Sequence, residues 1–269
     1  MSIFLRHSHN VKPERWGSEA DIQYAIRKNS EKIYGVDPDT NCLIKPGFWG
    51  FPCLDFSGKQ NHGTPYGGVA YHSGSLDFDG GDDYVEVTDN PLDITGSISI
   101  SGWVYRKTNT VTHHIISKNA LANTPFQIAM VATTNVLRSY TKGIAPETID
   151  STDTVSLNAW HNIVFVRDFS TVKVTFYIDG IQDSGGWQAY DPNDVAANDI
   201  TAKIGCIGNL SGNFLNGPIS EVRINNIALT AKQIALFYAR PWDLYRRVGR
   251  TYYSVAAAPS VYIPQIMIF

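Results

Sequence analysis

The chain has 269 residues, of which 43% are hydrophobic and 12% aromatic, and its formal net charge is −3. That length is enough for one sizeable β domain with extensions or for two small domains. The slightly acidic charge gives no general case for binding to nucleic acid or to anionic membranes. The N-terminal segment has no long apolar core, and no apolar run is long enough to span a bilayer. We therefore expect neither a signal peptide nor membrane insertion.

Residues 1–53 are predicted to form an N-terminal arm. The segment Glu19 to Ile33 has helical periodicity, with Ser18 as a candidate cap. The segment Asp37 to Pro52 carries three prolines and three aromatic residues. We interpret this second segment as an ordered arm or an outer strand, because aromatic residues are rare in disordered chain.

Residues 54–240 have the short alternating segments and frequent turns that predict a β-sandwich. The stretch SGSLDFDGGDDYVEV, residues 73–87, predicts a hairpin, because Gly80 and Gly81 supply the positive φ that a primed turn requires. Residues 163–166 are apolar on both faces, which is typical of a central strand in a two-layer stack.

A single helix, from Thr230 to Tyr238, is predicted near the end of this region. Thr230 and Gln233 have the spacing of a capping box, and Pro241 ends the helix. Residues 241–269 are predicted to form an Arg-rich box followed by an uncharged, apolar assembly arm that seeks a groove or a sheet edge. The expected assembly contacts are Trp242, Tyr245, Arg246, Arg247, Tyr262, Ile263 and Phe269.

Aromatic rings beside amides and carboxylates are typical of carbohydrate sites, since rings stack on sugars and polar groups bind their hydroxyls. One loop rich in Gly, Asp and Asn has this composition, and the next turn adds a further amide. The predicted carbohydrate-binding residues are Trp187, Tyr190, Asp191, Asn193 and Asn209. The alternative is that Trp187 packs at a sheet edge or a subunit contact.

The acidic residues Asp79, Asp82 and Asp83 are hard oxygen ligands that suit Ca²⁺. We favour instead that they cap turn amides, because calcium needs six or more oxygens. We therefore expect no cofactor and no metal. The three cysteines lack the paired spacing of a zinc site and are expected to be reduced, a Cys42–Cys53 bridge being the alternative. The adjacent pair His113-His114 is interpreted as a surface or loop pair.

Catalytic motifs are missing from the sequence. It contains no Glu-x-Asp-x-x-Glu strand motif that would place two glycosidase carboxylates on one face. It also contains no Ser-His-Asp signature and no Gly-x-Ser-x-Gly elbow. We therefore expect that the protein is not an enzyme.

Five segments, in order, resemble the laminin-G-like, concanavalin A-like jelly-roll domains of the pentraxin-related group. They are LDFSGKQNHGT (54–64), LDFDGGDDYVEV (76–87), SISISGWVY (97–105), LNAWHNIVFVRDFSTVKVTFYIDG (157–180) and GPISEVRINNIALTAKQIALF (217–237). The resemblance implies an all-β, two-sheet antiparallel jelly roll over about residues 54–240. It also implies that Trp103 and Trp160 occupy strand positions that pack in the core, so we interpret both as structural residues. The RPWDLY box with its proline-containing tail resembles the ends of jelly-roll proteins predicted in phage genomes.

From these features we expect a non-enzymatic virion structural or adhesion protein. Its lectin-like jelly roll would display a carbohydrate-binding surface, and its two arms would anchor it. The alternatives are a carbohydrate-active enzyme or its binding module, and a spacer or decoration protein without glycan binding. The expected partners are further copies of the chain, neighbouring virion proteins and a host surface glycan. The expected location is the surface of a virion or extracellular particle assembled in the host cytoplasm.

Overall fold

The computed structural model describes residues 40–46, 53–57, 59–72, 74–87, 92–120, 122–192 and 195–239, with the backbone alone at residues 45 and 46. The predicted helix at residues 19–33, Asn193 and the seven expected assembly residues lie outside the described residues. No helix among the described residues is long and apolar enough to cross a membrane.

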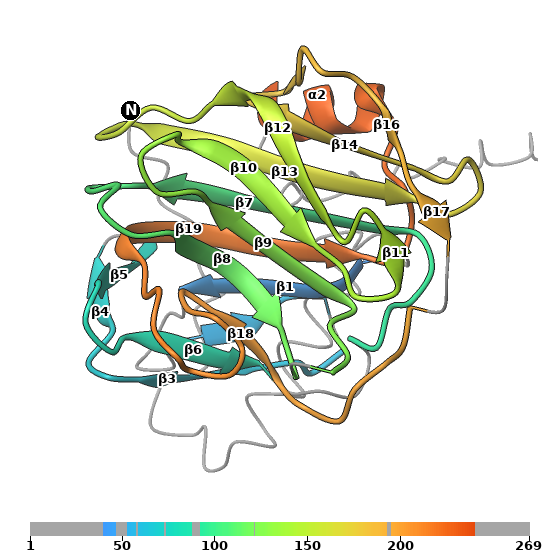
Figure 1. Ribbon diagram of the computed structural model, residues 1–269. Helices are drawn as coiled ribbons and strands as arrows, with labels where there is room; N and C mark the ends of the chain where they lie inside the picture. The colour runs from blue at the N-terminus through green and yellow to red at the C-terminus, as the bar shows by residue number, and fades with distance from the viewer. Residues whose placement is uncertain are drawn as a thin grey trace, which may run out of the picture.

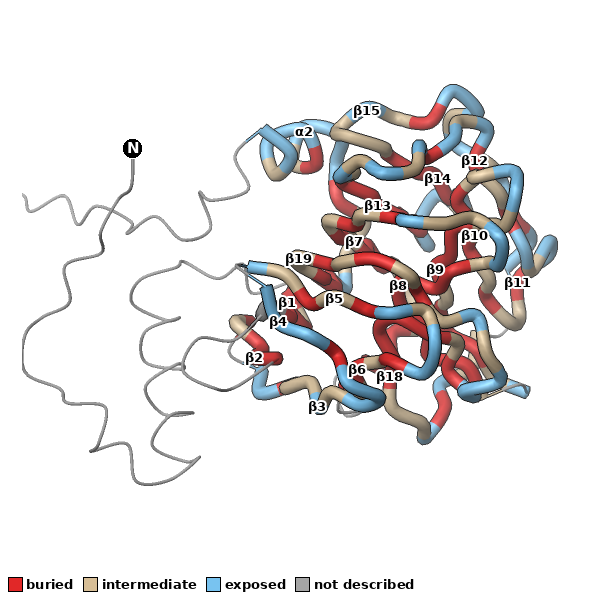
Figure 2. Tube along the Cα trace, turned by 90° about the vertical axis from the view of Figure 1, so that its left-hand side faces the viewer, coloured by how far each residue is buried: buried red, intermediate tan, exposed pale blue. Residues whose placement is uncertain are grey.

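Two antiparallel layers make up the molecule, as Figure 1 and the turned view of Figure 2 show. The front sheet runs in the order β3 (Gly63–Tyr66), β6 (Tyr84–Val87), β18 (Ala202–Ile204), β8 (His113–Lys118), β9 (Phe126–Met130), β10 (Val136–Tyr140) and β12 (Thr148–Thr154). The back sheet is built from β1 (Thr40–Pro46), β5 (Ser75–Asp79), β19 (Asn216–Asn225), β7 (Ile98–Tyr105), β13 (Trp160–Asp168) and β14 (Lys173–Ile178). The predicted antiparallel two-sheet sandwich is confirmed.

Short strands complete the two layers. The strand β2 (Cys53–Asp55) pairs with both β1 and β3 and so links the sheets at one edge. The remaining pairs involve β4 (Ala70–His72) with β5, β15 (Ile181–Gln182) and β16 (Gln188–Ala189) with β14, and β11 (Ile144–Ala145) with β17 (Asp191–Pro192). The predicted hairpin at residues 73–87 is wrong in its pairing: β5 pairs with β4 and β19 in the back sheet, whereas β6 pairs with β3 and β18 in the front sheet. The turn at residues 80–83 therefore connects the two sheets.

The core lies between the sheets and follows from the alternation of side chains along each strand. Phe165 of β13 and Phe176 of β14 contribute a tilted aromatic pair with ring centroids 5.6 Å apart. Inward-facing residues of the front sheet, such as Val85 and Ile128, are almost fully buried in the same cluster. The three cysteines are buried free thiols, as expected.

The central strand of the back sheet is β19, because β7 lies on one side of it and β1 and β5 lie on the other. Thr40 and Asn225, at the start of β1 and the end of β19, also share a side-chain hydrogen bond of 3.0 Å. Residues 40–46 therefore form an outer strand, as one of the two interpretations of that segment has it. The strand pairing of the sandwich extends in front of the predicted domain boundary at residue 54.

The helix α2 (Ala231–Ala239) packs on the outer face of the back sheet. Ile234 of α2 joins Val164 and Tyr177 of β13 and β14 in a second apolar cluster. The predicted capping box is confirmed, since Thr230 N donates to Gln233 Oε1 at 2.9 Å and Gln233 N donates to Thr230 Oγ1 at 3.3 Å.

Loss of this cap is expected to have a small effect. Replacing Thr230 by Ala should lower the free energy of unfolding by about 1 kcal/mol, because it leaves the Gln233 amide without its partner. Urea denaturation measures the change. Lys232→Ala, an exposed substitution in the first turn, is the control and should change stability by less than about 0.5 kcal/mol. Equal effects of the two substitutions would contradict the role of the cap.

Two placements differ from the sequence-based interpretation. The histidines His113 and His114 are buried rather than superficial, because β8 lies inside the front sheet and Arg106 Nε donates to His113 Nδ1 at 3.3 Å. Trp160 is 41% exposed rather than buried. The reason is its register: it pairs with Tyr105 at the start of β13, on the outer face of the back sheet.

Candidate functional site

A row of polar side chains crosses the outer face of the front sheet. Directly opposed residues in antiparallel strands point to the same face, and one continuous register runs through all seven strands. On each strand, the residues next to these outward-facing positions point to the opposite face, toward the core. The row consists of Thr64, Glu86, Lys203, Ser117, Gln127, Tyr140 and Thr148. We call it the front-face row.

An aromatic pair lies beside one end of this row. Tyr66 of β3 and Tyr84 of β6 are opposed in the register and stack with centroids 4.8 Å apart and an interplanar angle of 13°. The ring of Tyr66 is 43% exposed. Burial, followed by the nearby charge of Glu86, raises the pKa of Tyr84, so its phenol stays neutral. A flat apolar surface next to a carboxylate is thus available at this end.

The polar groups around Glu86 are held in fixed positions. Thr201 Oγ1 donates to Glu86 Oε1 at 2.8 Å and accepts from Lys203 Nζ at 3.1 Å. The thiol of Cys206 lies buried behind them, and burial raises its pKa to about 12, so it adds no charge at neutral pH. Glu86, which is partly exposed, and Lys203, which is only 8% exposed, are therefore joined through Thr201.

The other end of the row carries ion pairs. Tyr140 OH donates to Glu147 Oε2 at 3.1 Å, and Lys142 Nζ lies 2.6 Å from Glu147 Oε1. The hydrogen bond from Lys142 lowers the pKa of Glu147. On the adjacent positions, Arg138 binds both carboxylate oxygens of Asp150, at 2.6 and 2.7 Å. These carboxylates are ionised and bound to cations at neutral pH.

A turn covers the middle of the row. Gly208 N donates to Ser117 Oγ at 3.1 Å, and Ser117 Oγ also donates to Gln127 Oε1 at 3.1 Å. Asn209 follows Gly208 and is exposed. The turn thus divides the face into the Tyr66–Tyr84 end and the Tyr140 end, with Asn209 between them.

The structure does not bring the predicted carbohydrate-binding residues together. Trp187 is 40% exposed, in a loop that reaches the outer strand β12 through a 2.9 Å hydrogen bond from Gln188 Nε2 to Asp150 O. Asn209 lies over β8, and β12 is three strand spacings from β8, about 14 Å. Asp191 is exposed in β17. Tyr190 is only 4% exposed and packs in the core, so its ring has no face free for a sugar.

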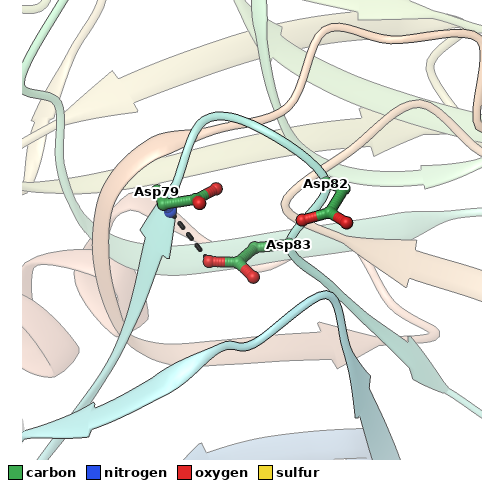
Figure 3. Close-up of side chains that lie close together, drawn as sticks. All are labelled: Asp79, Asp82 and Asp83. Carbon is green, nitrogen blue, oxygen red and sulfur yellow. Dashed lines mark hydrogen bonds between the residues drawn. The ribbon is translucent and has the colours of Figure 1, made fainter.

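The acidic residues of the turn between β5 and β6 lie close together, as Figure 3 shows, with one oxygen of each within 4.8 Å of the others. Two of the carboxylates cap the turn, since Asp79 Oδ1 accepts from Gly81 N at 2.6 Å and Asp83 Oδ2 accepts from Asp79 N at 2.9 Å. Burial and then the neighbouring carboxylates raise the pKa of Asp83. These contacts are those of a capped turn.

Comparison with known proteins agrees with this architecture. Residues 79–235 match the family model described as the concanavalin A-like lectin/glucanases superfamily. The chain belongs to this superfamily. A search of curated proteins finds no sequence match.

Solved structures of similar fold extend the comparison. Trypanosoma rangeli sialidase in complex with sialic acid has a TM-score of 0.63 and 9% identity, and the match covers 86% of this chain and 40% of the sialidase chain. The present chain thus spans about two fifths of the sialidase. Domain 4 of AbnA, an arabinanase from Geobacillus stearothermophilus, in complex with arabinotriose, has a TM-score of 0.57 and 19% identity, and the match covers 77% of this chain and 100% of that domain.

A third structure concerns botulinum neurotoxin type C, whose cell entry is described as dependent on interaction with two ganglioside molecules. It has a TM-score of 0.57 and 15% identity and covers 76% of this chain and 52% of its own. At these identities the likeness is one of fold. The superfamily member described here shares the lectin-like sandwich with proteins that bind sialic acid, gangliosides and arabinotriose.

Proposed function

We propose that this protein is a structural or adhesion protein that binds carbohydrate through the outer face of its front sheet without cleaving glycosidic bonds. One observation carries the proposal: the exposed Tyr66–Tyr84 stack lies beside Glu86 and Lys203 in the front-face row. Aromatic rings stack on the apolar faces of sugars, while fixed charged and polar groups bind the hydroxyls. The carbohydrate-bound structures of similar fold support this assignment.

The carboxylates of this face are badly placed for glycosidic cleavage. Glycosidases use two carboxyl groups about 5–10 Å apart. Glu86 lies on β6 and Asp150 on β12, and these strands are five spacings apart, about 24 Å along the sheet. Asp150 and Glu147 are also engaged by Arg138 and Lys142. This separation supports binding rather than hydrolysis of the glycosidic bond.

The aromatic stack gives the first test. Tyr66→Ala should weaken glycan binding at least about fivefold, because it removes the exposed stacking surface. The measurement is binding of the full chain to an array of host-envelope polysaccharides and glycans, followed by titration of the strongest binder. Phe169→Ala is the matched control, since Phe169 is 44% exposed and lies at the β13–β14 turn, away from the row. Equal losses in both variants, or no binding by the native chain, would contradict the proposal.

The same array separates two further parts of the proposal. We propose that binding needs no metal, with Asp79 and Asp83 acting as turn caps, so chelation should leave binding unchanged. Loss of binding on chelation and its return with calcium would overturn that part. A Trp187→Ala variant tests the loop site independently of Tyr66, and unchanged binding would assign Trp187 to a structural contact.

We also propose that the chain serves at the surface of a virion or extracellular particle and that residues 241–269 anchor it to copies of itself or to neighbouring proteins. The support is the composition of that segment, with Trp242, Tyr245 and paired arginines before an uncharged tail. Native mass spectrometry of the full chain and of a chain ending at residue 250 tests it. Identical monomers in both samples would remove the anchoring role.

A further inference from the structure

A hydrogen-bonded chain of Ser156, His161 and Asp179 lies at one end of the sandwich, where β12 of the front sheet leads into β13 of the back sheet. Ser156 Oγ is 2.7 Å from His161 Nε2, and His161 Nδ1 is 2.8 Å from Asp179 Oδ2. Ser156 is exposed, while the side chains of His161 and Asp179 are 14% and 30% exposed. The front-face row contains none of these residues.

Asp179 is held rigidly by the strand pair that carries it. It follows β14 with a φ of 53°, and its amide donates to Asn162 O at 2.8 Å. Its Oδ1 accepts from Asn162 N at 2.8 Å, which leaves Oδ2 for the imidazole. A carboxylate can only accept at neutral pH, so His161 Nδ1 carries a proton and donates it. In the neutral imidazole, Nε2 is then the acceptor and receives the hydrogen bond of the Ser156 hydroxyl.

This arrangement meets the geometric conditions for an activated serine. A nucleophile within 2.6–3.2 Å of a base, with the base oriented by a third group, is the recurring signature of covalent catalysis on unrelated folds. We propose that Ser156 is a nucleophile toward acyl esters, with His161 as its general base and Asp179 as the positioning residue. This activity is separate from carbohydrate binding and breaks no glycosidic bond.

The reaction would proceed in two balanced steps. Ser156 Oγ bonds to the acyl carbon as its proton passes to His161 Nε2, and the ester's alkoxy group leaves as an alcohol with that proton. A water molecule then attacks the acyl-serine, giving up a proton to His161, which returns it to Ser156 Oγ as the carboxylic acid departs. The net change is ester plus water to acid plus alcohol.

The position of Ser156 defines the class of substrate. Because its hydroxyl is exposed at the rim, the group it attacks must project from a larger molecule or belong to a small ester. Trp160, next to His161, forms an edge-to-face pair with Tyr105, with centroids 5.8 Å apart, and is 41% exposed at the same end of β13. An acyl ester carried by a sugar or other surface molecule fits this setting.

Labelling with a fluorophosphonate probe tests the proposal on the native full-length chain. Mass spectrometry of the digested product should locate the adduct on Ser156, and p-nitrophenyl acetate should be hydrolysed with an initial burst. Ser156→Ala should abolish both signals. Ser170→Ala is the matched control and should keep both, because Ser170 is also exposed and bonded to a carboxylate, that of Asp168, at 2.7 Å, but has no histidine beside it.

Two further variants distinguish a catalytic role of these hydrogen bonds from a purely structural one. His161→Gln and Asp179→Asn should each slow labelling by about 100-fold or more, with the melting temperature recorded alongside to identify unfolding. The proposal is overturned if the native chain acquires no adduct on Ser156 or if Ser170 is labelled equally fast. The three residues would then be a structural hydrogen-bonded contact. Glycan binding by the same sample is an independent result, so failure here does not bear on the proposed function.

Discussion

Acidification from about pH 6.5 to about pH 4 is expected to lower the free energy of unfolding by about 3 kcal/mol for each of two buried histidines. Burial, reinforced by Arg106, lowers the pKa of His113 to about 4, and burial lowers that of His114 to about 4. In this pH window the two histidines bind protons in the unfolded chain but stay neutral in the folded chain. The stabilising contribution is therefore complete above about pH 6.5 and is lost as the pH falls toward 4.

Urea denaturation at several pH values between 7 and 4 measures this dependence. Carboxylates with lowered pKa values, such as Asp153 and Asp168, add their own loss at the acid end. A chain with both His113→Gln and His114→Gln separates the two effects, because glutamine cannot be protonated. That variant should have a flatter profile between pH 6.5 and 4.5. The prediction is wrong if the free energy of unfolding of the native chain does not change between pH 6.5 and 4.5.

Replacement of Arg167 by Met is expected to destabilise the fold by about 3–5 kcal/mol. Arg167 is fully buried, and its guanidinium donates to the carbonyl oxygens of Ile94, Gly96 and Pro125 at 2.8–3.1 Å. It thereby binds the segment before β7 to the segment before β9. Methionine fills much of the volume but leaves these buried carbonyls without a donor.

The same substitution at Arg138 is the matched control. Arg138 forms a bidentate ion pair with Asp150, but its side chain is 40% exposed, so Arg138→Met should cost less than about 1 kcal/mol. Both variants are compared with the native chain by urea denaturation at neutral pH. Similar losses would mean that the buried carbonyls find other donors when Arg167 is removed.

The strand pattern and the helix cap were predictable because each depends on local sequence. The turn between β5 and β6 follows from Gly80-Gly81 between alternating segments, and α2 follows from the spacing of Thr230 and Gln233. The local sequence did not show that β5 and β6 join different sheets instead of pairing as a hairpin. The burial of His113 and His114 was not predictable, since an adjacent polar pair has the composition of a loop. They are enclosed by the pairing of β8 with β9 and by contacts with Arg106 and with the distant Asn213.

The candidate sites depend on the strand register between segments that are far apart in the chain. Local sequence patterns do not reveal that register. Glu86 and Lys203 meet although more than a hundred positions separate them, and Thr64 and Gln127 join the same row from two other strands. Ser156, His161 and Asp179 likewise match no spacing of a known signature, because a turn and a strand pair bring them together. Tyr190 was assigned to the surface from its loop, yet the chain turns it into the core.

The central position of β19 has a consequence for synthesis of the protein on the ribosome. The strands β1, β5 and β7 emerge early, but their shared partner at residues 216–225 is made near the end. Until then the nascent chain carries open strand edges, which can pair with other chains. Closure of the sandwich is therefore a late event that joins the first and last strands of the fold, and folding should be slow for a chain of this size.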